Sequence, residues 1–219
     1  MISQILLAAK KDPTITVGGI LKAIDGNLRV GKSDVFISEA CEYTNSFLHF
    51  FPKISIILNI EADHLDFFKD LEDIRHSFRL FAENTAPDGV IVLNGAIEQH
   101  DAITEGLSAK VVTYGLSADN DFYASDISYN EKGCASFLAH EGDTTIGQIT
   151  LSIPGEHNVQ NALAAIALCT QMKIPVASII SGLSAFHGTK RRFEKKGTVG
   201  GITIIDDYAL SLIHISEPT

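Results

Sequence analysis

Four short apolar runs, rich in Val and Ile, constrain the fold of this 219-residue chain more than any other feature: 34–38, 54–60, 89–94 and 110–115. Their apolar residues are nearly continuous rather than alternating, which is typical of strands buried on both faces. Segments with helical spacing separate the runs, as in the set Leu71, Ile74, Phe78 and Phe81. Strands that alternate with helices predict an α/β fold with a mainly parallel sheet flanked by helices.

The remaining segments differ in pattern. Residues 119–153 are punctuated by Gly and Asp and often alternate, which predicts a small antiparallel sheet. Helical spacing predicts a helix at the N-terminus, one over 96–107, and two more in the C-terminal third, over 157–172 and around 176–183. Gly200-Gly201 between two β-rich runs predicts a hairpin.

The composition of the chain limits the classes of partner that it can bind. The formal net charge of -10 argues against broad binding to nucleic acid or to anionic membranes. No apolar stretch reaches the roughly 18–20 residues of a membrane span. The three cysteines, Cys41, Cys134 and Cys169, form no CxxC pair, and no signal peptide precedes them, so we expect a cytoplasmic protein. The oligomeric state is not predicted.

Residues 26–33, GNLRVGKS, match the phosphate-loop pattern G-x-x-x-x-G-K-[ST]. That pattern binds phosphate only between a strand and a helix, because the loop amides and the helix N-terminus must both face the phosphates. Here a strand, 34–38, follows the pattern, and a helix-like or irregular stretch precedes it. We therefore expect a surface loop. The alternative is a nucleotide-binding NTPase that uses Lys32.

Acidic residues follow two of the predicted strands. Glu39 ends the run 34–38, and Asp63-His64 follows the run 54–60. Ligands of open parallel sheets bind beyond the carboxyl ends of the strands, and Mg²⁺ needs only one or two carboxylates beside phosphates. Glu39 is a candidate ligand, and His64 a less typical one. The alternative is that Asp63 and Asp66 cap the helix beginning near Asp70, with His64 in a surface turn.

Two carboxamides begin the apolar helix over 157–172. Asn158 and Asn161 are three residues apart and share one face of the first turn. Amides offer the donor and the acceptor that an adenine edge requires. The alternative is ordinary N-capping.

A basic cluster stands out in this acidic chain: Lys190, Arg191, Arg192, Lys195 and Lys196. Arg binds phosphate in a bidentate manner and stabilises charge in phosphoryl transfer. The alternatives are a solvated hairpin edge and a nucleic-acid patch.

Five motifs, in order along the chain, resemble the Mur ligases: EACEYTNSFL (39–48), NIEADHLDFF (59–68), GEHNVQNALAAIA (155–167), GTKRRFEKKG (188–197) and IDDYA (205–209). That family is similar to folylpolyglutamate synthases, and its members have three domains. The resemblance implies that 1–205 is the central ATP-binding domain without its phosphate loop, and that 206–209 begins a linker. Residues 210–219 look like a translated sequencing adapter and are set aside.

The resemblance also implies the roles of individual residues. ATP and Mg²⁺ are the expected cofactors, with Glu39 and His64 as metal ligands. His157, Asn158 and Asn161 are expected at the adenine, and Asp207 at the ribose. Arg192 is expected at the terminal phosphate, and Arg192 and His64 are the expected catalytic residues.

Within the family, the motifs are most similar to those of the enzyme that joins L-alanine to UDP-N-acetylmuramic acid through an acyl phosphate, in peptidoglycan biosynthesis. The chain by itself is expected to be inactive. Tyr43-Thr44-Asn45 departs from the acidic residues that many members carry there. The alternatives are another Mur-type ligase, such as one that recycles whole peptides, and a non-catalytic interaction domain.

Overall fold

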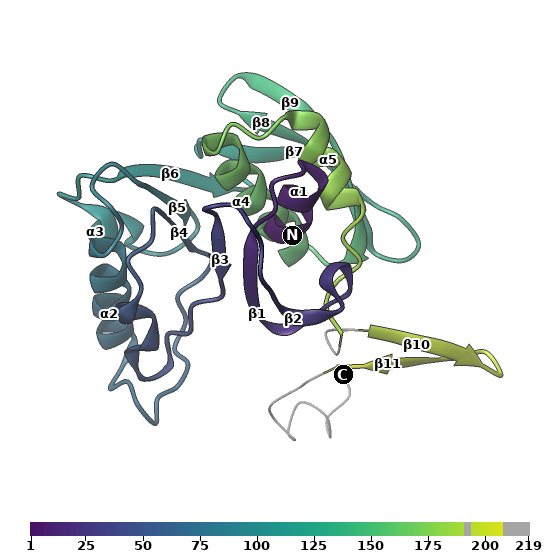
Figure 1. The fold of residues 1–219 in the computed structure, drawn as a ribbon, viewed down its shortest axis with the longest axis horizontal. Coiled ribbons are helices and arrows are strands. Elements are labelled where there is room, and N and C mark those ends of the chain that lie inside the picture. The colour runs from purple at the N-terminus through teal and green to yellow at the C-terminus, as the bar shows by residue number, and fades with distance from the viewer. Residues whose placement is uncertain (191–193, 208–219) are drawn as a thin grey trace.

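The computed structural model describes residues 1–190 and 194–207 and is built on one six-stranded sheet (Figure 1). The strand order is β4-β5-β6-β7-β8-β9. The strands are β4 Ile54–Ile57, β5 Val90–Asn94, β6 Lys110–Gly115, β7 Phe122–Tyr129, β8 Cys134–Glu141 and β9 Thr144–Pro154. β4 to β7 pair in parallel, and β7 to β9 pair antiparallel. The predicted α/β class is confirmed, and the predicted antiparallel strands extend the parallel sheet.

A second, smaller sheet has the order β2-β1-β3, with β1 at Thr14–Leu21, β2 at Gly26–Arg29 and β3 at Phe36–Ser38. The predicted strand 34–38 therefore pairs with β1 rather than with β4. The stretch 18–26, expected to be helix-like or irregular, divides between the end of β1, which reaches Leu21, and the 3₁₀ turn Lys22–Ile24. Thr and the branched residues at the start of β1 favour extended backbone over helix.

The α-helices of the described residues are α1 Ile2–Ala8, α2 Leu71–Glu83, α3 His100–Thr104, α4 His157–Gln171 and α5 Val176–Ser184. Apolar residues surround α4 almost completely, and it is buried between the sheet and the pair α1 and α5 (Figure 1). A helix that is apolar on all sides must be enclosed in this way. α2 and α3 lie together beside the β4–β6 end of the main sheet.

Two helix predictions need correction. Asp70 caps α2, because its carboxylate accepts from the backbone N–H of Asp73 at 3.0 Å. The capping role considered for Asp63 and Asp66 is therefore wrong. The helix expected over 96–107 is restricted to α3, since Gln99 before it and Gly106 after it both have positive φ.

The predicted hairpin is confirmed as β10 Glu194–Val199 and β11 Ile202–Asp206. Gly200 and Gly201 have φ of 58° and 81°, which is the conformation that a two-residue hairpin turn requires. The hairpin projects away from the sheets (Figure 1). In the described part of the chain, no helix combines the length and the apolar character needed to cross a membrane.

Candidate functional site

The loop that matches the phosphate-binding pattern lies between two strands. β2 ends at Arg29 and β3 begins at Phe36, so no helix follows Lys32 within the loop. The expectation that this match is not a phosphate loop is confirmed, because the helix N-terminus on which phosphate binding depends is missing.

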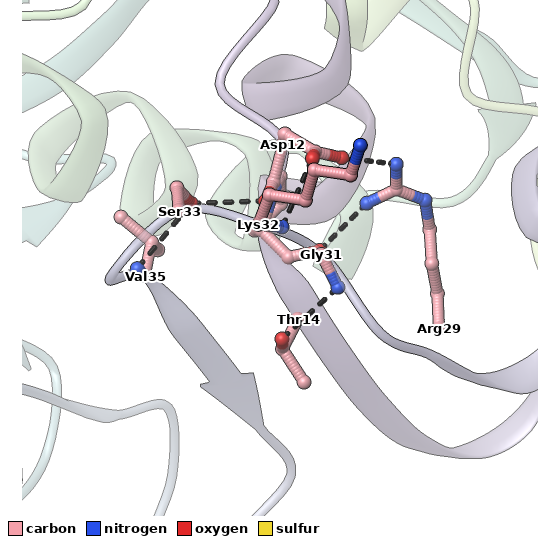
Figure 2. Close-up of polar contacts among 8 residues, drawn as sticks. Asp12, Thr14, Arg29, Gly31, Lys32, Ser33 and Val35 are labelled. Carbon is pink, nitrogen blue, oxygen red and sulfur yellow. Dashed lines mark hydrogen bonds and ion pairs between the residues drawn. The ribbon is translucent and has the colours of Figure 1, made fainter.

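The polar groups of this loop are instead used within the protein, as Figure 2 shows. The carboxylate of Asp12 accepts from the backbone N–H of Lys32 at 2.9 Å and from the guanidinium of Arg29. These two partners, the Arg29 hydrogen bond first, hold the pKa of Asp12 below its usual value. The hydroxyl of Ser33 donates to the Asp12 carbonyl at 2.9 Å. The loop therefore anchors the segment between α1 and β1.

A cavity of about 330 Å³ lies where three parallel strands end and α4 begins. Its lining residues come from the carboxyl ends of β4, β5 and β6 and from the first turn of α4: Leu58, Asn59, Asn94, Ala96, Tyr114, His157, Gln160 and Asn161. This is the edge at which open α/β sheets bind ligands. Two of the three candidate base-binding residues, His157 and Asn161, line it.

The third candidate, Asn158, is not among the lining residues but contacts both of the others. Its Nδ2 donates to the Pro154 carbonyl at 2.7 Å and lies 3.1 Å from His157 Nε2. Its Oδ1 accepts from Asn161 Nδ2 at 3.3 Å. The structure therefore brings these three residues together. Ordinary N-capping is wrong as an explanation, because Glu156 is the N-cap of α4 and no side chain caps that helix.

The other six cavity residues, among them Asn94, Tyr114 and Gln160, were missed by the sequence analysis. Asn94, the last residue of β5, is only 6% exposed and donates to the Leu58 carbonyl at 3.0 Å and to Gln160 Oε1 at 3.1 Å. Its position at a strand end was the available signal, since the same rule selected Glu39. Tyr114 is also buried here, which raises the pKa of its phenol.

Glu39 follows β3, in the smaller sheet. Its side chain is exposed, and Oε2 accepts from the backbone N–H of Gly18 at 2.6 Å. A methyl group at position 18 would lie 3.0 Å from the same oxygen, so glycine at that position allows the close approach. The carboxylate is thus held in place while remaining open to solvent.

His64 lies in the segment after β4, and its neighbours differ from those of Glu39. Its Nε2 lies 3.5 Å from Glu42 Oε1, and its ring is 4.6 Å from the ring of Tyr43. The hydroxyl of Tyr43 donates to Asp66 at 2.8 Å, and this acceptor raises the pKa of Tyr43. Glu42 beside His64 is a second pairing that the sequence analysis missed.

The residues around Glu39 and His64 supply only part of a coordination shell for Mg²⁺. Within residues 1–190 and 194–207, no three His, Cys, Asp or Glu side chains are grouped closely enough to hold a metal ion. The contacts of these residues do not join Glu39 to His64. Mg²⁺ prefers oxygen ligands and needs few of them from the protein when phosphates and water complete its shell, so the carboxylate of Glu39 suits it better than the imidazole of His64.

The remaining predicted site residues belong to the C-terminal part. Asp207 follows β11 and is exposed. Arg192 lies outside the described residues, and so does the segment 210–219 that the sequence analysis set aside. The predicted phosphate and ribose contacts therefore stay predictions.

Comparisons with known proteins match this chain to one family. The model of the Mur ligase middle domain matches residues 1–169. The chain is 59% identical over 209 residues to UDP-N-acetylmuramate–L-alanine ligase of Agathobacter rectalis, covering 95% of this chain and 46% of that protein. It thus spans about half the length of the curated relatives it matches.

Two solved structures share the fold. UDP-N-acetylmuramate–alanine ligase from Thermotoga maritima aligns with a TM-score of 0.80 and 27% identity, over 96% of this chain and 47% of that one. UDP-N-acetylmuramate:L-alanyl-γ-D-glutamyl-meso-diaminopimelate ligase from Neisseria meningitides aligns with a TM-score of 0.76 and 25% identity, over 87% and 62%.

Proposed function

This chain belongs to the Mur ligase family, and from that membership we propose that the longer protein of which it is part joins L-alanine to UDP-N-acetylmuramic acid with ATP. The observation that carries the proposal is the 59% identity, over 209 residues, to a curated ligase of that specificity. Among the solved structures, the alanine ligase from Thermotoga maritima and a murein peptide ligase from Psychrobacter arcticus are each 27% identical to this chain, so the preference over the peptide-recycling alternative rests on the 59% identity alone.

The cavity supports the nucleotide half of the proposal. It lies at the carboxyl edge of parallel strands and is lined by the carboxamides Asn59, Asn94, Gln160 and Asn161. Amides supply both donors and acceptors, which a purine base needs and a phosphate does not. We propose that His157 and Asn161 contact the base, with Asn158 holding them in position.

The remaining roles follow the same assignment. Bound ATP supplies a phosphoryl group that activates the substrate carboxylate, so that an amine can displace phosphate and form the amide. Glu39 and His64 are the proposed magnesium ligands, Arg192 the proposed contact to the terminal phosphate, and Asp207 the proposed contact to the ribose. Such chemistry depends on positioning and on neutralising charge, and it requires no nucleophile from the protein.

We propose that 1–205 forms the central ATP-binding domain and that 206–209 begins the connection to a further domain. Segment 210–219 is proposed to be foreign to the enzyme. We place the reaction in the cytoplasm, an assignment supported by three unpaired cysteines.

The test uses the longer protein encoded by the genomic reading frame that contains this chain. With ATP, Mg²⁺ and UDP-N-acetylmuramic acid, we expect amide formation with L-alanine and much less with a peptide substrate. The 219-residue chain assayed alone is expected to form no product. Preference for a peptide over L-alanine, or activity of the short chain at a comparable rate, would contradict the proposal.

Two substitutions in the longer protein distinguish a nucleotide site at the start of α4 from one that uses Lys32. Asn161→Ala removes a proposed base contact, and we expect the KM for ATP to rise about 10-fold or more. Lys32→Ala leaves the Asp12 contact intact, since that contact uses the backbone N–H, so we expect a change below about 3-fold. The reverse outcome would favour an NTPase that uses Lys32.

A further inference from the structure

The orientation of the Asn94 carboxamide is determined by backbone groups. Its Oδ1 accepts from the Ala96 N–H at 3.0 Å, and its Nδ2 donates to the Leu58 carbonyl at 3.0 Å. An N–H can only donate and a carbonyl can only accept, so exchanging the oxygen and nitrogen of Asn94 would break both bonds. Burial of Asn94, at 6% exposure, adds to the cost of such a break.

Asn94 in turn orients Gln160. Because the Nδ2 of Asn94 is a donor, the atom of Gln160 that meets it at 3.1 Å must be the acceptor Oε1. Gln160 lines the cavity, and its side-chain amide nitrogen is therefore the atom that takes no part in the bond to Asn94. None of the described residues accepts a hydrogen bond from that nitrogen.

A second relay orients Asn161. The Pro154 carbonyl accepts from Asn158 Nδ2, so Oδ1 of Asn158 is the atom that faces Asn161. Asn161 must present its Nδ2 to that oxygen, so its own Oδ1 takes no part in the bond. Within the described part of the chain, no donor meets that Oδ1. Gln160 and Asn161 thus present to the cavity an unused donor and an unused acceptor, each set by a chain of bonds from the backbone.

We propose that Gln160 recognises the base of the nucleotide by donating from its side-chain amide to a ring nitrogen, and that Asn94 is the positioning residue that holds this donor toward the cavity. The inference rests on the proposed nucleotide site. Adenine carries an exocyclic amino donor beside a ring-nitrogen acceptor, which is the complement of the Gln160 donor and the Asn161 acceptor. The ligand preferred by the pair is therefore a 6-aminopurine over a 6-oxopurine.

Adenosine and inosine test this preference, since they differ only in the atoms at and beside position 6. Both are titrated into the 219-residue chain, followed by amide chemical shifts. We expect adenosine to bind about 10-fold more tightly than inosine, because the N1–H of inosine would face the Gln160 donor and its carbonyl would face Asn161 Oδ1. Equal affinities would overturn the assignment of Gln160 while leaving a nucleoside site. No shifts at His157 or Asn161 with either nucleoside would overturn the proposed nucleotide site itself.

Gln160→Glu keeps an oxygen for Asn94 to bind and replaces only the donor that faces the cavity. We expect adenosine affinity to fall about 10-fold and the preference over inosine to shrink below about 3-fold. Gln171→Glu is the matched control: it makes the same change at the last turn of α4, where Gln171 bonds Lys110 at 2.9 Å, and should leave both affinities unchanged. An unchanged preference in Gln160→Glu would overturn the proposal.

Asn94→Asp tests the positioning role without changing Gln160. An oxygen in place of Nδ2 would face the Leu58 carbonyl and Gln160 Oε1, so Gln160 should turn its amide nitrogen away from the cavity. We expect a loss of adenosine preference similar to that of Gln160→Glu. The double variant that combines Asn94→Asp with Gln160→Glu should lose no more than about a further 3-fold, because one donor cannot be removed twice. Additive losses would overturn the positioning role. If Asn94→Asp does not fold, Gln160→Glu and its control still decide the proposal.

Discussion

Gly31 is the residue at which the loop approaches the backbone most closely. A methyl group built there would lie 2.1 Å from the Asp12 carbonyl oxygen and 2.4 Å from the Pro13 carbonyl. Backbone atoms cannot move aside as the end of a flexible side chain can. The second glycine of the phosphate-loop pattern is thus required for packing against the α1–β1 connection.

We therefore expect Gly31→Ala to lower the free energy of unfolding by roughly 1–3 kcal/mol or more, as overpacking does elsewhere. Gly26→Ala is the matched control, because its methyl group would meet only ordinary contacts at 3.8 Å and beyond. Urea denaturation of the two variants makes the comparison. Equal stabilities would show that the loop is free to move away from the residue 12–13 backbone.

At the scale of elements, α1 and α5 are held together across a glycine. A methyl group at Gly182 of α5 would lie 2.4 Å from the Cα of Ile5, a fully buried residue of α1. α1 also contacts α4, so a displaced α1 would disturb the packing around the helix that carries the cavity amides.

Gly182→Ala is expected to destabilise the protein by about 1–3 kcal/mol, although Ala favours helix over Gly by about 1 kcal/mol. The sign of the change therefore distinguishes packing from helix propensity. Ser181→Ala, at an exposed position of the same helix, should be within about 0.5 kcal/mol of the parent. A net gain in the thermal midpoint for Gly182→Ala would contradict the close contact between α1 and α5.

At the scale of the whole molecule, the core that encloses α4 buries the thiol of Cys169 completely, and burial raises the pKa of this thiol from 9.0 to about 12. Between these values the unfolded chain loses a proton that the folded chain keeps. The free energy of unfolding should therefore fall by about 1 kcal/mol as the pH increases from 9 to 10.

Cys169→Ala supplies the control, because it removes this thiol and keeps every other titrating group of the chain. The difference between the pH dependences of the two chains isolates the thiol. Urea unfolding at pH 9 and pH 10 measures it. Identical pH dependence in the two chains would contradict a thiol that stays protonated in the folded core.

Local pattern was sufficient for most elements of the fold. The strands near 54–57, 90–94 and 110–115, the helices α2, α4 and α5, and the hairpin at Gly200-Gly201 all follow from spacing and turn chemistry within a few residues. The pairing of 34–38 with β1 could not be predicted in the same way. The composition of an apolar strand shows that it will be buried but does not select its neighbour.

The candidate site, like the fold, was predictable from the sequence only in part. The sequence by itself determined that Asn158 and Asn161 share a helical turn and that the loop 26–33 lacks a helix after it, because both depend on residues a few positions apart. Only the tertiary structure decided that Asn94 meets Gln160, 66 positions away, and that Glu42 rather than Glu39 lies beside His64. Those contacts depend on the order of the strands and on how α4 packs across them, which are long-range properties that no local spacing encodes.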